Sequence, residues 1–349
     1  MRLLASDIPP IKTGLDNYSK GFIESFFEAN KVTMLVGYVA ADAIVELKAL
    51  IESHHKLEQF DLVVGMAKFD GLFQSQFDAL KALNAYLAKR QIGLIHIAVA
   101  LPIHAKASAF SDAGHIHTAI VGSSNLSGLV QSFRQFEMDV LIDEEETSKE
   151  VFRVIDDALD KASKPLSEVE DSLKILENPN LILEGVPNVE RVPTNNIAEK
   201  LTETTFELLV KSEPKSNLNI YFGKGRLQKG HAIPRPWYEV ELIIGVETTR
   251  QTGYPQAGTE DAEFEVITDD GWRFPCQIQG QNSKNFRSRD DLKTLGKWIK
   301  ERLQNSGSLV VGEPVTEQSL LHYGRNSITF TKMDEPNLWF LDFARPNDK

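Results

Sequence analysis

The hydrophobic pattern of the chain changes near its middle, and this change limits the folds it can adopt. The first half alternates apolar runs, such as 32–39 and 92–101, with helix-like segments, such as 41–54 and 73–90. Strands alternating with helices are typical of a layered α/β domain. The second half carries many short strand-like runs separated by Gly, Pro, Asn and Asp, with one clear helix over 289–303. It predicts a mainly β pseudobarrel with one helix.

A proline-containing acidic segment separates the two halves. It has low apolar periodicity, which is typical of a linker. We therefore expect an α/β domain over 1–164 with a mixed sheet and flanking helices, a linker over 165–194, and a pseudobarrel over 195–349. We interpret the linker as a solvated tether. A second hypothesis is that its carboxylates lie near a functional cleft of the first half and repel or mimic a polyanionic ligand there.

Polar residues follow the apolar runs of the first half in an ordered series. His104 and Lys106 are two residues apart at the end of a predicted strand over 94–103, so the strand period of two places both on one face. A Gly-Ser-Ser-Asn turn, residues 122–125, follows the next strand. Glu137 lies on the strand after that, on the same face as Asp139. We expect these side chains to meet at one edge of a sheet.

This set of side chains suits phosphodiester hydrolysis without a metal. An imidazole can attack phosphorus and form a covalent phosphohistidine. Ammonium, hydroxyl and amide donors can stabilise the charge that develops on the phosphoryl oxygens. A carboxylate on the far nitrogen of the imidazole would orient the ring. The candidate catalytic residues, for which neither metal nor cofactor is required, are His104, Lys106, Ser123, Asn125 and Glu137.

The motif resembles that of the phospholipase D superfamily, whose signature is His-x-Lys, four residues, Asp, and then a Gly-Ser-x-Asn turn. The family's later Glu matches Glu137. One position departs from the signature, because Ser111 stands where the family has Asp, and Asp112 is one residue late. The Asp is commonly absent in the restriction-endonuclease branch, so the departure points to that branch. A second match to the template, His54-His55-Lys56, lacks the later turn.

The net charge of −12 argues against binding nucleic acid, but basic residues cluster locally in the second half. The segment 211–235 contains one acidic residue, and 273–289 contains none. The polar run 277–288 combines amides, which read adenine edges, with Arg, which reads guanine. The candidate DNA-binding residues are Lys211, Lys215, Lys224, Arg226, Lys229, Arg235, Arg273, Gln279, Gln281, Asn282, Lys284, Asn285 and Arg287.

Together, the two halves resemble restriction endonucleases of the NgoFVII/NgoAVII and BfiI type. The resemblance implies a phospholipase D-like nuclease followed by a pseudobarrel like the plant B-three fold, which grips double-stranded DNA with two arms. Superfamily members use two His-Lys sets per site, and this chain has one convincing set. We therefore expect a homodimer that shares one site through the N-terminal domains. The family also implies a cognate DNA methyltransferase.

Three alternatives to a DNA endonuclease remain open. The first half could act on a lipid or nucleotide phosphodiester, or it could be inactive and leave a DNA-binding protein. His115-x-His117 could ligate zinc, but no further ligands at suitable spacing accompany it. The single Cys276, the lack of a signal-like N-terminus and the lack of a membrane-length apolar run predict a cytoplasmic protein.

Overall fold

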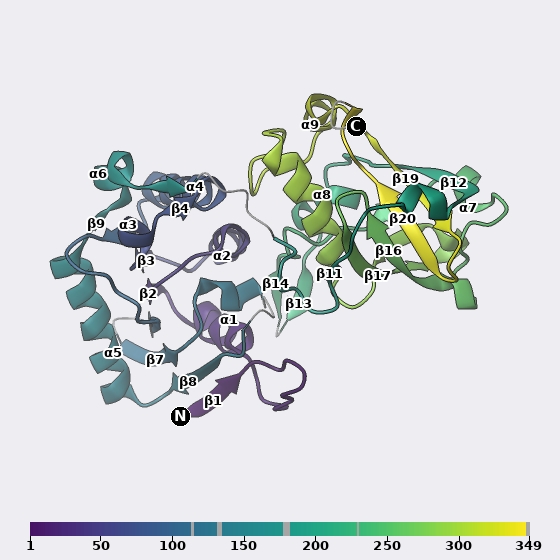
Figure 1. Ribbon diagram of the computed structural model, residues 1–349. Helices are drawn as coiled ribbons and strands as arrows, with labels where there is room; N and C mark the ends of the chain where they lie inside the picture. Colours follow the sequence, from purple (N-terminus) through teal and green to yellow (C-terminus); the bar gives the residue numbers. More distant parts are fainter. Residues whose placement is uncertain (113–114, 131–134, 177–181, 229, 347–349) are drawn as a thin grey trace. The chain divides into compact units, whose positions relative to one another are not determined.

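The computed structural model describes residues 1–349 except 113–114, 131–134, 177–181, 229 and 347–349. The chain forms two compact units, Met1–Pro179 and Asn180–Lys349 (Figure 1). The boundary between them falls inside the expected linker.

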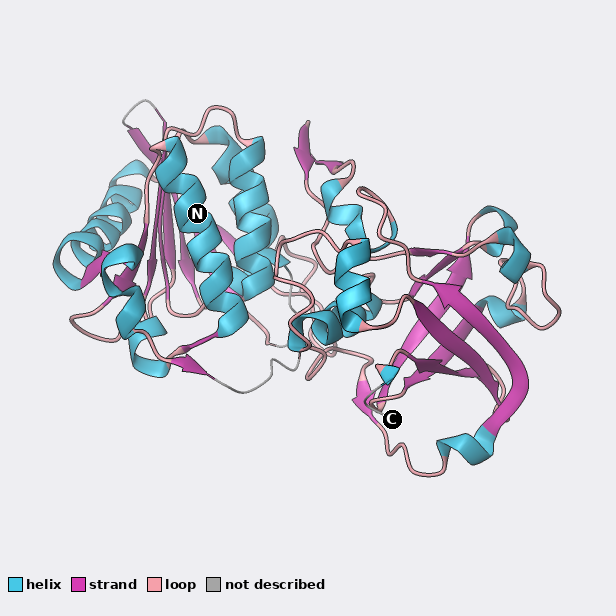
Figure 2. Cartoon of the chain, turned by 90° about the horizontal axis from the view of Figure 1, so that it is seen from above, coloured by secondary structure: helices cyan, strands magenta, loops and turns pink. Residues whose placement is uncertain are grey.

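Unit 1 is built on a mixed sheet with the strand order β1-β8-β7-β6-β2-β3-β5-β9. The β2, β3 and β5 strands are parallel, and the other neighbours in the order pair antiparallel. Helices cover both faces of the sheet (Figure 2). The strands are β1 (Arg2–Ala5), β2 (Lys31–Val36), β3 (Gln59–Val64), β5 (Ile95–Ala98), β6 (Ala107–Asp112), β7 (His115–Gly122), β8 (Met138–Ile142) and β9 (Ser163–Pro165). The helices are α1 (Tyr18–Glu28), α2 (Ala41–Ser53), α3 (Ala67–Asp70), α4 (Gln74–Arg90), α5 (Glu145–Asp157) and α6 (Leu166–Val169).

The central strands of unit 1 are apolar on both faces because helices cover both sides. On one face, Phe22 of α1 contacts Phe110 of β6 edge to face, with ring centroids 5.5 Å apart. On the other face, Leu35 and Val63 pack in one buried cluster with Ile155 of α5. These two cores fix the sheet between its helices and hold its edge loops in place.

The described parts of 165–194 differ from the expected tether. The β9 strand pairs with β5, and β10 (Ile175–Leu176) pairs with β4 (Leu72–Phe73). Leu166 is 1% exposed, so this stretch contributes to the core of unit 1. Further on, β11 (Glu190–Arg191) pairs with β17 (Trp272–Gln279) of unit 2. The sequence did not predict these contacts, because short strands and single helical turns need only two or three buried side chains. Such a small number of apolar residues shows no periodicity.

Unit 2 is built on a curved sheet with the strand order β12-β19-β20-β16-β17-β18-β15 (Figure 2). The strands of this sheet are β12 (Leu201–Leu209), β15 (Leu242–Ile243), β16 (Glu263–Thr268), β17 (Trp272–Gln279), β18 (Asn285–Ser288), β19 (Ser327–Met333) and β20 (Leu338–Asp342). A separate hairpin is formed by β13 (Arg226–Gln228) and β14 (His231–Ile233), and the helices are α7 (Val246–Thr249), α8 (Thr294–Asn305) and α9 (Glu317–Tyr323). The predicted helix over 289–303 is α8, which begins later than expected.

The core of unit 2 is aromatic. Phe330 of β19 stacks on Trp339 of β20 with ring centroids 4.0 Å apart, and Phe264 and Phe286 contact Phe330. Such large rings bury much apolar area each, so a short-stranded sheet can hold together around few residues.

Candidate active site and nucleic-acid interface

One edge of the unit 1 sheet collects the loops that carry the predicted catalytic residues. The register pairs Leu35 with Ala107, and Ala107 with Val121. The pairing of Gly122 with Asp139 places the start of β8 at the same edge. This is the carboxyl edge of β2, β3 and β5, where ligands bind in open α/β sheets. The side chains brought to this edge are those of His104, Lys106, Ser123, Asn125 and Glu137.

The apolar run predicts that His104 and Lys106 lie at the end of the preceding strand, but in the structure they lie outside it. The β5 strand ends at Ala98, and both residues lie in the segment that leads into β6. Directly after β5, the amides of Val99 and Ala100 both donate to the Ala162 carbonyl, and Ile103 further on donates to the carbonyl of Gly65, so the apolar run does not continue as a strand. The sequence pattern could not distinguish a strand from an apolar loop that packs on the sheet edge.

The Lys106 ammonium contacts His104 directly. Its Nζ lies 3.0 Å from Nδ1 and 3.2 Å from Nε2 of the imidazole, and it donates to the His104 carbonyl at 2.7 Å. His104 is exposed, whereas Lys106 is buried. Burial lowers the pKa of Lys106, and the nearby carboxylate of Glu137 opposes that shift. The pair therefore offers an accessible imidazole beside a partly desolvated cation.

Asn125 is oriented by a residue that the sequence analysis missed. The Tyr38 amide donates to Asn125 Oδ1 at 2.9 Å, so the Asn125 amino group is the part left to donate to a ligand. The Tyr38 ring lies 5.6 Å from the His104 ring in an edge arrangement, and its hydroxyl donates to Asp70 at 2.6 Å. A Cβ at Gly37 would lie 3.3 Å from His104 Cδ2. The Gly-Tyr pair directly after a buried strand was the available signal.

The Gly-Ser-Ser-Asn turn is fastened to β8. Ser123 Oγ accepts from the Met138 amide at 3.0 Å. Ser124 donates to Asp139 through its amide at 3.0 Å and its hydroxyl at 2.6 Å. Asp139 is 2% exposed, and burial raises its pKa against these hydrogen bonds. Glu137 is half-buried. Within the described residues, the ring of His104 has Lys106 as its polar partner, and not the carboxylate we expected.

The other histidine candidates have structural contacts. His54 is buried, with Nε2 2.9 Å from the Phe26 carbonyl and 2.7 Å from that of Ala29. His117 contacts the hydroxyl of Thr118 at 2.8 Å. Ser111, at the family's Asp position, is buried within β6. Across the described residues, no group of three or more His, Cys, Asp or Glu side chains could hold a metal ion.

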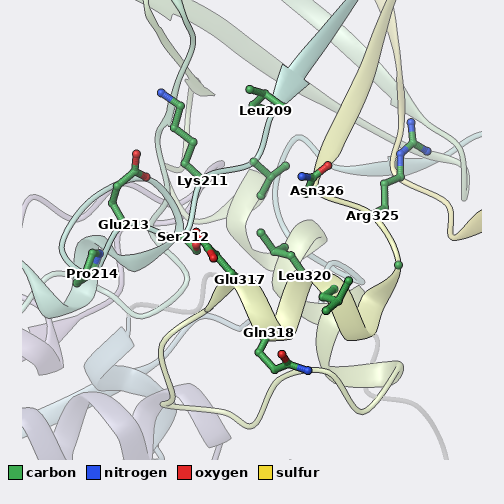
Figure 3. A pocket seen from close by; sticks show the side chains of 13 residues that line it. Leu209, Lys211, Ser212, Glu213, Pro214, Glu317, Gln318, Leu320, Arg325 and Asn326 are labelled. Atoms are coloured by element: carbon green, nitrogen blue, oxygen red, sulfur yellow. The ribbon is translucent and has the colours of Figure 1, made fainter.

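In unit 2, the first basic cluster surrounds a buried carboxylate. Arg226 and Arg235 both donate to Oε1 of Glu239, at 2.6 and 2.5 Å, and Glu239 is 1% exposed. Lys211 is not part of this cluster. It lines an open groove of about 920 Å³, opposite Arg325 (Figure 3). Of the remaining predicted residues, Lys215 and Lys224 are exposed, and Lys229 lies outside the described residues.

The second basic cluster lies on the β17–β18 hairpin. Gln279 of β17 pairs with Asn285 of β18, and Arg287 donates to the Gln279 side chain. Asn285 donates to Glu241 at 3.1 Å, and Arg287 lies 3.7 Å from the same oxygen. The loop between the two strands carries the remaining predicted residues, Gln281, Asn282 and Lys284.

Acidic residues of neighbouring strands pair with the arginines of this surface. Arg273 lies 3.7 Å from Glu190 and 3.8 Å from Glu265. Arg289 lies 3.3 Å from Glu263. The segment 273–289 contains no acidic residue, but in the folded structure the register of β11, β16 and β17 places carboxylates of other segments beside its arginines. Sequence clustering alone therefore overstated the positive charge of this surface.

Comparison with known families gives two matches that together span most of the chain. Residues 17–171 match the N-terminal PLD domain of the NgoFVII restriction endonuclease, and residues 196–334 match the NgoFVII C-terminal B3-like DNA-binding domain. No curated protein sequence matches. No helix among the described residues is long and apolar enough to span a bilayer.

Similar solved structures include Nuc, a phospholipase D family member from Salmonella typhimurium. It is 12% identical, the match covers 47% of this chain and 96% of Nuc, and the TM-score is 0.34. NucT from Helicobacter pylori is also 12% identical, with coverages of 41% and 87% and a TM-score of 0.30. The assignment rests on the two family models, which confirm the predicted fold of each half. The chain belongs to the NgoFVII restriction endonucleases and combines their phospholipase D-type N-terminal domain with their B3-like DNA-binding domain.

Proposed function

We propose that this protein is a metal-independent, site-specific endonuclease for double-stranded DNA. The observation that carries the proposal is the grouping of His104, Lys106 and Asn125 at one sheet edge of a phospholipase D-type domain. A B3-like DNA-binding domain follows it in the same chain. The family supports a DNA endonuclease, and the side chains at the edge supply nucleophile and phosphate donors without a metal.

The proposed reaction has two displacements. An imidazole nitrogen of His104 forms a bond to phosphorus while the bond from phosphorus to the leaving oxygen breaks. The leaving oxygen takes a proton from the imidazolium of a second copy's site. Water then attacks the phosphohistidine, its proton passes to the second imidazole, and the bond between nitrogen and phosphorus breaks. Lys106 and the Asn125 amino group stabilise the phosphoryl oxygens in both steps.

A homodimer through the N-terminal domain supplies the second imidazole. Large apolar side chains are exposed around the sheet edge that carries His104, in the segments that follow β2, β3 and β5, directly before β8 and at its first residue. Exposed apolar side chains that surround a polar site favour burial against another surface. These side chains are Tyr38, Phe69, Leu101, Phe136 and Met138. A two-fold axis beside them would bring two His-Lys sets to one phosphodiester.

The test is cleavage of mixed-sequence plasmid DNA in excess EDTA. Discrete fragments are expected from the wild-type protein, and none from His104→Ala, which should still bind DNA. His55→Ala is the matched control, because His55 is an exposed histidine in the second match to the His-x-Lys template. A strict Mg²⁺ requirement would refute the mechanism. A smear would point to a non-specific nuclease, and intact DNA to an inactive nuclease half or a non-DNA substrate.

We also propose the cellular setting that the family implies. A site-specific nuclease in the cytoplasm needs a cognate methyltransferase to protect host DNA. The partnership is functional. Expression of the active protein should slow the growth of cells, and co-expression of a DNA methyltransferase that modifies the same sequence should restore it; cells that express His104→Ala should grow normally with or without the methyltransferase.

A further inference from the structure

We infer that Glu239 and Glu241 are positioning residues that hold both DNA-reading clusters of unit 2 on one rigid segment. This inference rests on the proposed function. The two carboxylates are two residues apart, and each binds arginine from a different cluster. Glu239 binds Arg226 and Arg235, and Glu241 binds Arg287. The segment 237–241 thus connects the β13–β14 hairpin to the β17–β18 hairpin.

Helix α8 packs against the segment 237–241 and fixes its backbone. Trp237, Tyr238 and Val240 are each 3% exposed or less. A Cβ at Gly296 of α8 would lie 1.8 Å from the Tyr238 carbonyl oxygen, so only glycine allows the helix to approach this closely. One turn later, the Lys300 ammonium donates to the Trp237 carbonyl and lies 4.3 Å from the centroid of the Trp237 ring. The backbone that carries both carboxylates therefore has little freedom.

Glu239 holds the first cluster with one oxygen. Its Oε1 accepts from both Arg226 and Arg235, while Oε2 is buried with no hydrogen-bond partner among the described residues. The Arg226 side chain is 57% exposed, so its guanidinium is held at one nitrogen and open on the solvent side. A guanidinium anchored in this way keeps free donors for a phosphate or a base edge.

Glu241 holds the second cluster more loosely. Its Oε1 accepts from Asn285 at 3.1 Å and lies 3.7 Å from Arg287. Both charged side chains of the pair are about a quarter exposed. The Nε of Arg287 is buried without a partner, so the guanidinium is oriented mainly by Gln279 and Glu241. DNA can therefore reach this pair and compete with Glu241 for Arg287.

The arrangement favours specificity over affinity. A DNA phosphate can bind Arg287 only by replacing the carboxylate that Arg287 already contacts. Non-specific DNA therefore gains little binding free energy from this arginine. A guanine edge offers Arg287 two acceptors in the geometry of its donors and can outcompete the carboxylate. Because both clusters share one segment, their separation is set before DNA arrives, and less ordering cost falls on the cognate complex.

The experiment uses full-length protein in a His104→Ala background, with EDTA, so that DNA is bound and not cut. Affinity is measured for the cognate duplex, identified from the plasmid fragments, and for a scrambled duplex across a series of salt concentrations. Glu241→Gln keeps the shape and removes the charge. Glu313→Gln is the control, because Glu313 is exposed and forms no ion pair among the described residues. Thermal unfolding is followed in parallel.

For Glu241→Gln, we expect scrambled DNA to bind roughly 3–10-fold tighter, with cognate affinity little changed. The salt dependence on scrambled DNA should steepen by about one phosphate contact, a slope change near 0.9. Glu239→Gln should lower discrimination in the same direction. Discrimination equal to that of Glu313→Gln, or parallel loss of both affinities, would overturn the inference and leave the nuclease assignment intact. A wild-type protein without any sequence preference would overturn both.

Discussion

Lys300 is buried in unit 2 at a high electrostatic cost, and replacing it should stabilise that unit at neutral pH. The side chain is fully buried in α8, and among the described residues it forms no ion pair. Burial lowers its pKa from 10.5 to about 7. We predict that Lys300→Met makes unit 2 more stable at pH 7, because methionine has a similar length and no charge to bury.

The size of the effect follows from the pKa shift. A lowering from 10.5 to about 7 corresponds to about 5 kcal/mol, at about 1.4 kcal/mol per pH unit. Methionine also loses the hydrogen bond to the Trp237 carbonyl, which costs about 1–3 kcal/mol. The net gain at pH 7 is therefore about 2–4 kcal/mol.

The sign of the pH dependence is fixed by proton binding. Between pH 7 and pH 10.5 the unfolded chain holds a proton on Lys300 and the folded chain does not, so wild-type stability rises with pH across this window. The advantage of Lys300→Met should shrink by about 1.4 kcal/mol per pH unit and vanish between about pH 8.5 and pH 10. Residues common to both proteins cancel in this difference.

Urea unfolding monitored by tryptophan fluorescence measures this difference in the intact chain. All four tryptophans, Trp237, Trp272, Trp298 and Trp339, lie in unit 2, so the signal reports that unit alone. The reasoning is refuted if the stability difference between the two proteins is constant from pH 7 to pH 10.

Three further predictions concern unit 1. Gly37→Ala should slow single-turnover cleavage about tenfold with little change in thermal unfolding, because a Cβ 3.3 Å from His104 Cδ2 displaces the imidazole by a few tenths of an ångström; a wild-type rate would contradict this. Asp139→Ala should destabilise unit 1 by about 2–4 kcal/mol in circular-dichroism melts, since the buried Ser124 amide and hydroxyl lose their acceptor; an unchanged melt would show that water replaces the carboxylate. A fragment ending at residue 179 should fold and sediment as a dimer, while one ending at 165 should melt lower because it lacks the buried Leu166; equal melting temperatures would contradict the assignment of this stretch to unit 1.

The elements and residues that could be predicted best from the sequence are those whose positions depend on the hydrophobic pattern and turns of a short stretch of chain. The apolar strand β2 lies where the hydrophobic run 32–39 predicts it, because a run covered by helices on both faces has no polar alternation to obscure it. Asn125 and Glu137 reach the same edge as His104 because a turn after one strand and the start of the next must meet there. Antiparallel pairing alone dictates this.

The residues that sequence could not place depend on distant pairing. Tyr38 orients Asn125 from 87 positions away, through a backbone amide that no side-chain motif encodes. The contact of Arg273 with Glu265 depends on the register of β16 against β17, which sequence does not specify for strands of mixed polarity. Glu239 was absent from the predicted sites because a buried carboxylate is recognisable only once its two arginines are seen beside it.

Under the proposed function, the carboxylates beside Arg273 and Arg289 have a consequence for the search for a target sequence on DNA. A surface whose cations are already paired releases few counterions when it meets arbitrary DNA, so encounters with non-cognate sequence are short-lived. Brief contacts give short sliding distances along the duplex, and the search then proceeds mainly by repeated three-dimensional collisions. An overall charge of −12 acts in the same direction by repelling DNA at long range. We predict that a site-specific nuclease with such a surface samples widely separated stretches of a genome and pauses where base edges replace its own carboxylates.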